Sequence, residues 1–275
     1  MYLQKFFINE EVHNMRLALA QLDIAWEDKT ANKETALQFI KQAATEKVDM
    51  VLFPEMALTG FSMNTSLIGE LNDKTKEFFK EMSSKFNISI GFGYVEGTSN
   101  SKNKYSVVSP SGSELVNYTK IHPFSFGEET QFYQSGKEIA SFNAFGFTIT
   151  PFICYDLRFP EIFQIASKTA TLITVAANWP LERREHWITL LKARAIENQC
   201  YIAGINRVGQ GNGLIYSGDS MIIDPLGNII SSLYMEDGLI IADIFPYVVT
   251  QTRENFKLKE DRKEALYCNI FKTTL

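Results

Sequence analysis

The chain has 275 residues, of which 45% are hydrophobic and 21% are charged, a composition typical of an ordinary folded protein. Its 27 Lys and Arg residues against 32 Asp and Glu residues give a net charge of −5, which argues against a nucleic-acid partner, because such proteins usually carry a basic patch. No apolar run is close to the length of about 20 residues that a membrane-spanning helix needs, and three cysteines do not form a secreted disulfide framework. We therefore expect a cytoplasmic protein that does not contact a membrane.

Short apolar runs alternate with segments of helical period along the chain. In chain order, strands are predicted at residues 16–22, 49–53, 88–95, 105–109, 114–119, 147–154, 171–177, 201–206, 220–223, 228–231 and 239–244. Helices are predicted after Asn32, the expected N-cap, over 75–86, from Pro160 and over 183–199. This alternation, interrupted by hairpins, predicts an α/β fold with a mixed sheet. No linker divides the series, so we expect one domain over residues 15–275, with residues 1–14 as an N-terminal extension.

Three predicted strands end at residues that can carry out chemistry. Glu55 follows the strand at 49–53, Lys120 follows the hairpin, and Cys154 ends the strand that begins at 147. In α/β folds, functional residues gather at the carboxyl ends of strands. A carboxylate, an amine and a thiol brought together there suit covalent acyl transfer: the thiol attacks, the carboxylate moves protons and the ammonium faces the oxyanion.

Each of these residues also has a purely structural interpretation. A cysteine after an apolar strand, such as Cys154, is often a small buried hydrophobe. Charged side chains at strand ends, such as Glu55 and Lys120, are mostly solvated. Sequence spacing alone does not establish that the three residues meet.

Three motifs resemble the Glu–Lys–Cys signature of the nitrilase, or carbon–nitrogen hydrolase, superfamily. They are PEMALTGF around Glu55, YTKIH around Lys120 and FICYDLRFPE around Cys154, and the resemblance extends over residues 15–244. The stretches NWPLERREHW at 178–187, ARAIENQCYIAGINRVG at 193–209 and YSGDSMIIDPLG at 216–227 resemble the omega-amidase branch. Members of that branch hydrolyse the distal amide of 2-oxo acids such as 2-oxoglutaramate.

The resemblance implies a fold, an assembly and a set of roles. The fold is a four-layer αββα sandwich, commonly assembled as a homodimer or a larger homo-oligomer. Glu55 is then the general base, Cys154 the nucleophile, and Lys120 stabilises the oxyanion together with the backbone N–H of Tyr155. Many members use a second glutamate to position the lysine. The segment EETQFYQSG offers Glu128 and Glu129, and the family spacing favours Glu129.

The implied substrate is a small amide with a free carboxylate, which an arginine is best shaped to bind. Four arginines lie in or beside the motifs: Arg158, Arg183, Arg184 and Arg207. Arg158 has the alternative role of anchoring the turn after Cys154 through a salt bridge. The remaining candidates for contact with the substrate are Phe61, Tyr155, Asn178 and Trp179. In the helix at 183–199, Arg194 falls on the buried face, where Glu197 is its expected partner.

Other functions are less well supported by the sequence. The three histidines, His13, His122 and His186, lack metal-ligand spacing, and the glycines at 91–93 and 209–213 lack a dinucleotide fingerprint, so no metal or cofactor is expected. A non-enzymatic interaction protein on this scaffold would be expected to lack one of Glu55, Lys120 and Cys154. A nitrilase, an N-carbamoyl amino-acid hydrolase and a deaminated-glutathione-type amidase remain open, because they share the thiol chemistry.

Overall fold

Two mixed β-sheets form the centre of the protein in the computed structural model, which describes residues 14–274. The predicted extension at 1–14 lies outside the described residues, except for the exposed Asn14. The first sheet has the strand order β13 (Gly238–Ile244), β1 (Met15–Gln21), β2 (Met50–Leu52), β3 (Ser89–Glu96), β4 (Lys102–Val108) and β5 (Glu114–Thr119). Strands β1, β2 and β3 are parallel, and the other pairs are antiparallel.

The second sheet has the strand order β10 (Val208–Gly211), β11 (Leu214–Ile223), β9 (Tyr201–Asn206), β8 (Leu172–Ala177), β7 (Phe147–Ile153) and β6 (Phe142–Ala144), and β12 (Ile229–Tyr234) also pairs with β11. Strands β7, β8 and β9 are parallel neighbours. Every residue of β8 and β9 is buried, as expected for strands covered on both faces.

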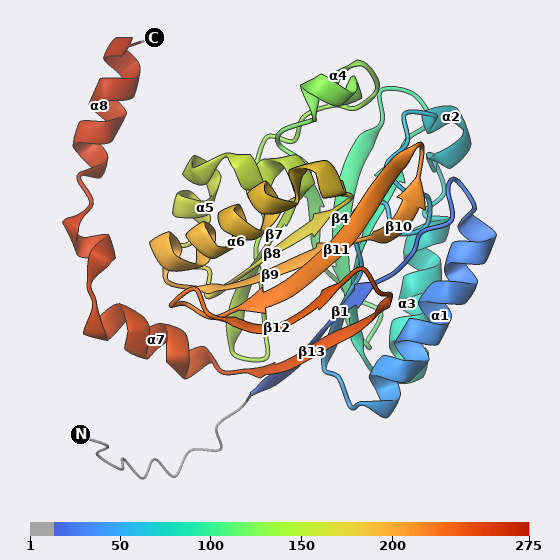
Figure 1. Ribbon diagram of the computed structural model, residues 1–275, viewed down its shortest axis with the longest axis horizontal. Coiled ribbons are helices and arrows are strands. Elements are labelled where there is room, and N and C mark those ends of the chain that lie inside the picture. The colour runs from blue at the N-terminus through green and yellow to red at the C-terminus, as the bar shows by residue number, and fades with distance from the viewer. Residues whose placement is uncertain (1–13, 275) are drawn as a thin grey trace.

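Helices cover the outer faces of both sheets (Figure 1). Helices α1 (Lys29–Thr45) and α3 (Lys74–Phe86) pack on the first sheet, and α5 (Pro160–Ala166) and α6 (Arg184–Asn198) lie on the second. This arrangement confirms the four-layer αββα sandwich. Two one-turn helices, α2 (Thr65–Ile68) and α4 (Glu129–Phe132), lie in connections. No helix within residues 14–274 is long and apolar enough to cross a membrane.

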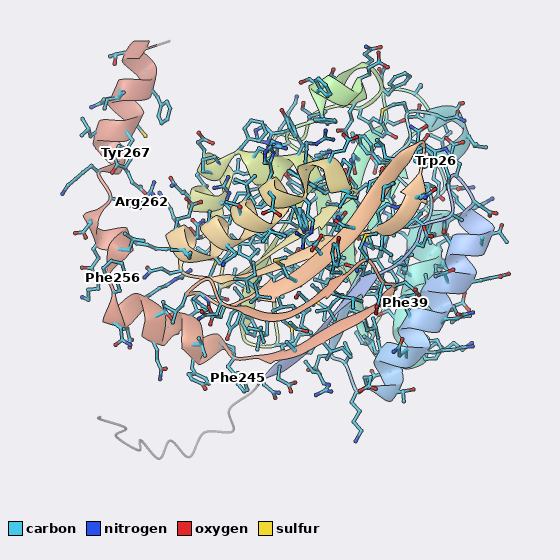
Figure 2. All side chains as sticks on the ribbon, viewed as in Figure 1. Trp26, Phe39, Phe245, Phe256, Arg262 and Tyr267 are labelled. Atoms are coloured by element: carbon cyan, nitrogen blue, oxygen red, sulfur yellow. The ribbon has the colours of Figure 1, made fainter. Side chains whose placement is uncertain are left out.

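The C-terminal segment differs from the rest of the fold. Helices α7 (Pro246–Asn255) and α8 (Glu264–Thr274) follow β13, and α8 extends away from the sheets (Figure 1). Figure 2 shows Phe256, Arg262 and Tyr267 along this segment, and Arg262 donates to Gln164 of α5 at 2.7 Å. Phe256 is 64% exposed. These helices were not predicted from the sequence.

Two apolar layers hold the four-layer structure together. Between the sheets, Leu17 and Leu19 of β1 belong to one cluster with Tyr105 and Phe152. Between α1, α3 and the first sheet, the ring of Phe79 stacks on that of Phe92 at a centroid distance of 4.2 Å. Full burial of such a side chain contributes about 1.5–3 kcal/mol. The ends of the strands are therefore fixed by the packing of the layers.

Two expectations about local structure need correction. Asn32 does not cap a helix: α1 begins at Lys29, and Asp28 is the cap, because its Oδ1 accepts from the N–H groups of Thr30 and Ala31, both at 3.0 Å. The buried Asn32 side chain instead donates to the carbonyls of Ala25 and Leu58. The predicted strand at 220–223 is the end of the longer β11, which pairs with β10 through a turn at 212–213.

Candidate active site

The ends of three strands bring Glu55, Lys120 and Cys154 together. Glu55 lies three residues after β2, Lys120 directly follows β5, and Cys154 directly follows β7. The backbone N–H of Lys120 donates to the carbonyl of Asn103 at 2.9 Å, which fixes it beside β4. Strands β2 and β5 belong to the first sheet and β7 to the second. The site therefore lies where strands of both sheets end.

Lys120 binds two buried carboxylates. Its Nζ lies 3.0 Å from Oε1 of Glu55 and 2.8 Å from Oε2 of Glu129. The three side chains are at most 1% exposed. Glu128, the other candidate for the second acid, is exposed. The geometry thus places Glu129, and not Glu128, against the lysine.

Asn103 connects the two carboxylates, and no sequence motif pointed to it. Its Nδ2 donates to Oε1 of Glu55 at 2.7 Å and to Oε1 of Glu129 at 2.9 Å. Asn178 binds Glu55 from the other side, because its backbone N–H donates to Oε2 at 3.0 Å. The backbone N–H of Phe124 donates to Glu129. Buried charges are stable only when paired and hydrogen-bonded, and each member of this cluster meets that condition.

The cluster changes the proton affinity of its own members. Burial opposes the charged form of Lys120, but the carboxylates of Glu129 and Glu55 outweigh burial and raise the pKa of the lysine. Burial also raises the pKa of Glu129, with a further increase from Glu55 and an opposing effect from Lys120. Lys120 is therefore a fixed ammonium ion at neutral pH.

Cys154 lies in a strained turn between β7 and the short 3₁₀-helix Cys154–Arg158. Its φ of 44° is in the left-handed region, which costs a residue with a side chain about 1–3 kcal/mol. Burial and the charge of Glu55 raise the pKa of the half-buried thiol, and Lys120 opposes this rise. The thiol is therefore protonated at neutral pH.

Asp156, a second residue that no motif pointed to, anchors the turn. Its Oδ2 accepts from the backbone N–H of Ile153 at 3.1 Å and from the hydroxyl of Tyr118 at 2.8 Å. Its Oδ1 lies 2.8 Å from Nδ1 of His122, whose ring stacks on Phe159. These contacts give His122 a structural role and hold Cys154 at the end of its strand.

One pocket collects most of the predicted site residues. Its lining includes Lys120 and Cys154 together with Phe61, Tyr155, Arg158, Asn178 and Trp179. Glu55 and Glu129 do not line this pocket but contact its lysine. The sequence did not indicate that Phe124, Pro180, Leu214 and Tyr216 would complete the wall. Leu214 and Tyr216 are on β11, whereas Phe124 and Pro180 lie in connections, and only the tertiary fold brings them together.

The structure separates the candidate arginines into two groups. Arg184 pairs with Asp219 at 2.7 Å, and Arg207 pairs with Asp23 at 2.9 Å. Arg158 and Arg183 line the pocket, and neither forms an ion pair with any carboxylate of residues 14–274. Arg158 therefore does not anchor its turn through a salt bridge.

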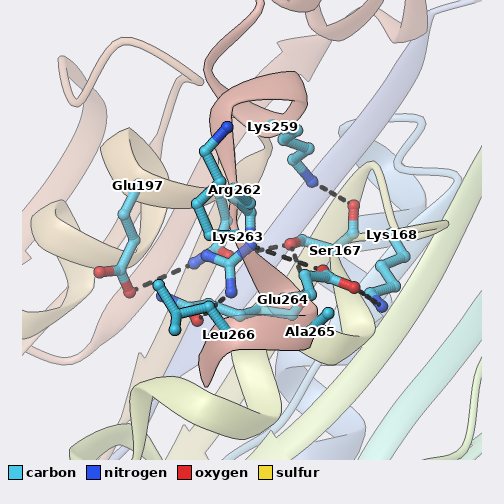
Figure 3. A pocket seen from close by; sticks show the side chains of 11 residues that line it. Ser167, Lys168, Glu197, Lys259, Arg262, Lys263, Glu264, Ala265 and Leu266 are labelled. Carbon is cyan, nitrogen blue, oxygen red and sulfur yellow. Dashed lines mark hydrogen bonds and ion pairs between the residues drawn. The ribbon is translucent and has the colours of Figure 1, made fainter. Parts of the chain in front are cut away.

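Two further arrangements are structural. Arg194 is buried and pairs with Glu197 at 2.8 Å, as expected. A larger hollow between α5, α6 and the C-terminal segment is lined by charged side chains that bind other groups of the protein (Figure 3). Lys168 pairs there with Glu264, and Lys259 donates to the carbonyl of Ser167. That hollow does not contain the cysteine or either buried carboxylate.

In the described part of the chain, no group of three or more His, Cys, Asp or Glu residues is arranged to hold a metal ion.

Similarity to known proteins agrees with this geometry. Residues 16–254 match the carbon-nitrogen hydrolase family. The chain is 31% identical to the 2-oxoglutaramate amidase of Bacillus subtilis over 91% of its length and 98% of the relative. It is 34% identical to the omega-amidase YafV of Escherichia coli K12 over 91% of its length and 97% of the relative.

Solved structures show the same fold. XC1258 from Xanthomonas campestris, a CN-hydrolase superfamily protein with an arsenic adduct in its active site, aligns with a TM-score of 0.86 at 30% identity, over 91% of this chain and 98% of that one. The similarity in sequence thus extends over the sandwich and all three strand ends. The chain belongs to the carbon-nitrogen hydrolase family and is an amidase.

Proposed function

We propose that the protein hydrolyses the distal amide of a small 2-oxo dicarboxylic acid, such as 2-oxoglutaramate, through a thioester on Cys154. The observation that carries this proposal is a pocket lined by Cys154, by Lys120 and by two arginines that form no ion pair with a carboxylate of residues 14–274. The names of the relatives from Bacillus subtilis and Escherichia coli support the same class of substrate.

In the first half of the reaction, Glu55 takes the proton of the Cys154 thiol as Sγ attacks the amide carbon. The negative charge that develops on the amide oxygen faces the ammonium of Lys120 and the backbone N–H of Tyr155. When the tetrahedral intermediate collapses, Glu55 returns the proton to the nitrogen. The C–N bond breaks, ammonia leaves, and the acyl group stays on the sulfur.

In the second half, water takes the place of ammonia. Glu55 removes a proton from the water molecule while the water oxygen attacks the thioester carbon, and the C–S bond then breaks. The sulfur takes the proton from Glu55 and leaves as a thiol, and the carboxylic acid product is released. Glu129 and Asn103 act through Lys120 and Glu55, because they hold both side chains in place.

The outer part of the pocket supports a short anionic substrate. Arg158 is available to bind the substrate carboxylate, and its guanidinium lies 4.7 Å from the ring centre of Trp179. Phe61 and Tyr155 provide apolar surface for a short carbon chain, and Asn178 lines the same wall. Such a pocket suits a compact linear acid better than a bulky aromatic nitrile.

We extend the proposal to the whole chain as one carbon–nitrogen hydrolase domain over residues 15–275, located in the cytoplasm and assembled as a homodimer or a larger homo-oligomer. Two apolar side chains of α8, Leu266 and Phe271, are 54% and 60% exposed, and a second copy of the chain would cover such a surface. Light scattering of the purified protein measures its mass and tests the assembly.

The experiment that tests the activity compares ammonia release from 2-oxoglutaramate, 2-oxosuccinamate, an N-carbamoyl amino acid and an aromatic nitrile. We expect the highest kcat/KM for one of the two oxo-acid amides. Deaminated glutathione should be added to the panel, with release of cysteinylglycine measured in place of ammonia, because this chain is 29% identical over 80% of its own length to the deaminated glutathione amidase of Synechocystis. A higher kcat/KM for any of the other three compounds than for both oxo-acid amides would contradict the proposed substrate.

A further inference from the structure

Arg183 and Arg158 are supported by aromatic rings of the pocket. The guanidinium of Arg183 lies 5.7 Å from the ring centre of Phe124, and that of Arg158 lies 4.7 Å from the ring centre of Trp179. Trp179 also connects the two arginines, because its Nε1–H donates to the backbone carbonyl of Arg183 at 2.8 Å. A guanidinium held by its face against a ring keeps its in-plane N–H groups free for a planar anion.

The two cations repel each other in the absence of a ligand. Burial lowers the pKa of Arg158, and the positive charge of Arg183 lowers it further. On its outer side, Nη2 of Arg158 lies 3.3 Å from the ring nitrogen Nδ1 of His186. Glu185, which lines a hollow with these two residues, pairs with Arg184. Among residues 14–274, no carboxylate forms an ion pair with Arg158 or Arg183, and a bound anion would relieve the repulsion between the two arginines.

We infer that Arg183 is a specificity-determining residue, which together with Arg158 binds an anionic group at the end of the substrate opposite to the reacting amide. The inference rests on the proposed function and extends it. A 2-oxo carboxylate fits this pair well, because its carboxylate and its oxo oxygen are coplanar acceptors for two separate guanidinium groups. Arg183 does not contact the buried cluster of Lys120, so its effect should fall on the choice of substrate and not on bond breaking.

The test compares succinamate with its methyl ester, in which the negative charge is removed and one methyl group is added. We expect the wild-type enzyme to prefer succinamate. The Arg183→Gln variant should lose about 10- to 100-fold in kcat/KM for succinamate, the amount associated with hydrogen bonds to a charged group. For the ester, the loss should be less than about threefold, and Arg183→Lys should recover part of the activity on succinamate. Lys192→Gln, which removes one exposed positive charge from α6, is the matched control and should change neither value.

Three results would overturn the inference. An equal loss on both amides would show that Arg183 shapes the pocket through Phe124 and does not sense charge. No loss on either would show that Arg183 has no role in selection. If the enzyme hydrolyses neither succinamate nor its ester, calorimetric titration of the Cys154→Ala protein with succinamate tests Arg183 alone, and the proposed function is judged separately by the panel that contains the two oxo-acid amides. Tighter binding of succinamate than of the ester, removed by Arg183→Gln, would support the inference, and equal binding would contradict it.

Discussion

The buried end of the pocket and its outer end differ in whether their positive side chains are paired with carboxylates. At the buried end, Lys120 is neutralised by Glu55 and Glu129 within 3.0 Å, before any substrate arrives. At the outer end, Arg158 and Arg183 rest on aromatic rings, and no carboxylate of residues 14–274 pairs with them. Because the charges at the buried end are balanced without substrate, that end can stabilise the transition state of any amide substrate. The charges at the outer end are balanced only when an anion binds, so that end can distinguish anionic from neutral substrates.

The largest effect should come from the nucleophile at the buried end. Cys154→Ala should fold normally and lose essentially all turnover of every amide, charged or neutral, because no thioester can form. Cys268→Ala is the matched control, since Cys268 is an exposed free cysteine on α8. Ammonia release from succinamate and from its methyl ester measures the effect. Retained activity of the Cys154→Ala protein on either amide would contradict the role of Cys154 as the nucleophile.

The next largest effect should follow removal of the ammonium. Lys120→Met should lower kcat by about 100- to 1,000-fold for both amides, as loss of one oxyanion donor does. It should also destabilise the fold by about 3–5 kcal/mol, because two buried carboxylates lose their counter-ion. Urea unfolding measures this stability. A change confined to KM would instead make Lys120 a binding residue.

The stability of the Lys120→Met protein should also depend on pH with a defined sign. The pKa of Glu129 is raised above its usual 4.5 in the folded protein, and loss of the ammonium removes an interaction that lowers it. A carboxyl whose pKa is higher in the folded state binds more protons there, so stability falls as pH rises from the unfolded pKa through the folded pKa. The loss of stability of the Lys120→Met protein relative to the wild type should therefore be smaller at pH 5 than at pH 8. An equal or larger loss at pH 5 would contradict the arrangement of charges.

A smaller effect should separate the two adjacent glutamates. Glu129→Gln should lower kcat by about tenfold or more for both amides, because Lys120 loses one of its two carboxylates. Glu128→Gln should have little effect, since that side chain is exposed and is hydrogen-bonded only through its backbone. If both substitutions reduced kcat equally, the local backbone, and not the carboxylate, would be the important feature.

The last prediction concerns the reactivity of the thiol itself. Because burial and Glu55 raise the pKa of Cys154, its alkylation by iodoacetamide should accelerate steadily from pH 7 to pH 9, by up to about tenfold per pH unit. The rate of loss of activity measures this reaction. A rate that is already constant at pH 7 would mean that a thiolate exists in the free enzyme, and Glu55 would then not be needed to form it.

The sequence predicted the buried end well and the outer end poorly. Glu55, Lys120 and Cys154 were candidates because each follows an apolar strand, and the resemblance of their motifs to the nitrilase superfamily selected them. Asn103 and Asp156 were not, because their hydrogen bonds join residues 48 and 38 positions apart in the chain. Four arginines were equivalent in the sequence. Only the fold shows that Asp23, 184 positions from Arg207, neutralises that arginine.

Local structure was predicted with similar limits. Apolar runs identified most strands of both sheets, because burial on both faces leaves little choice of residue, but β6 and β10 were not predicted. The start of α1 was wrong, since Asp28 and Asn32 are both good N-cap residues, and only tertiary contacts place Asn32 inside the fold. Helices α7 and α8 were not predicted, because few of their side chains are buried against the sheets.

The central claim, that Cys154 carries the acyl group during turnover, is tested most directly by rapid acid quench. Wild-type enzyme mixed with succinamate and quenched within the first turnover should yield a succinyl thioester on the peptide that contains Cys154, detected by mass spectrometry and removed by hydroxylamine. The Cys154→Ala protein should yield no such adduct. An acyl group on any other residue, or ammonia release by the Cys154→Ala protein at the wild-type rate, would contradict the account.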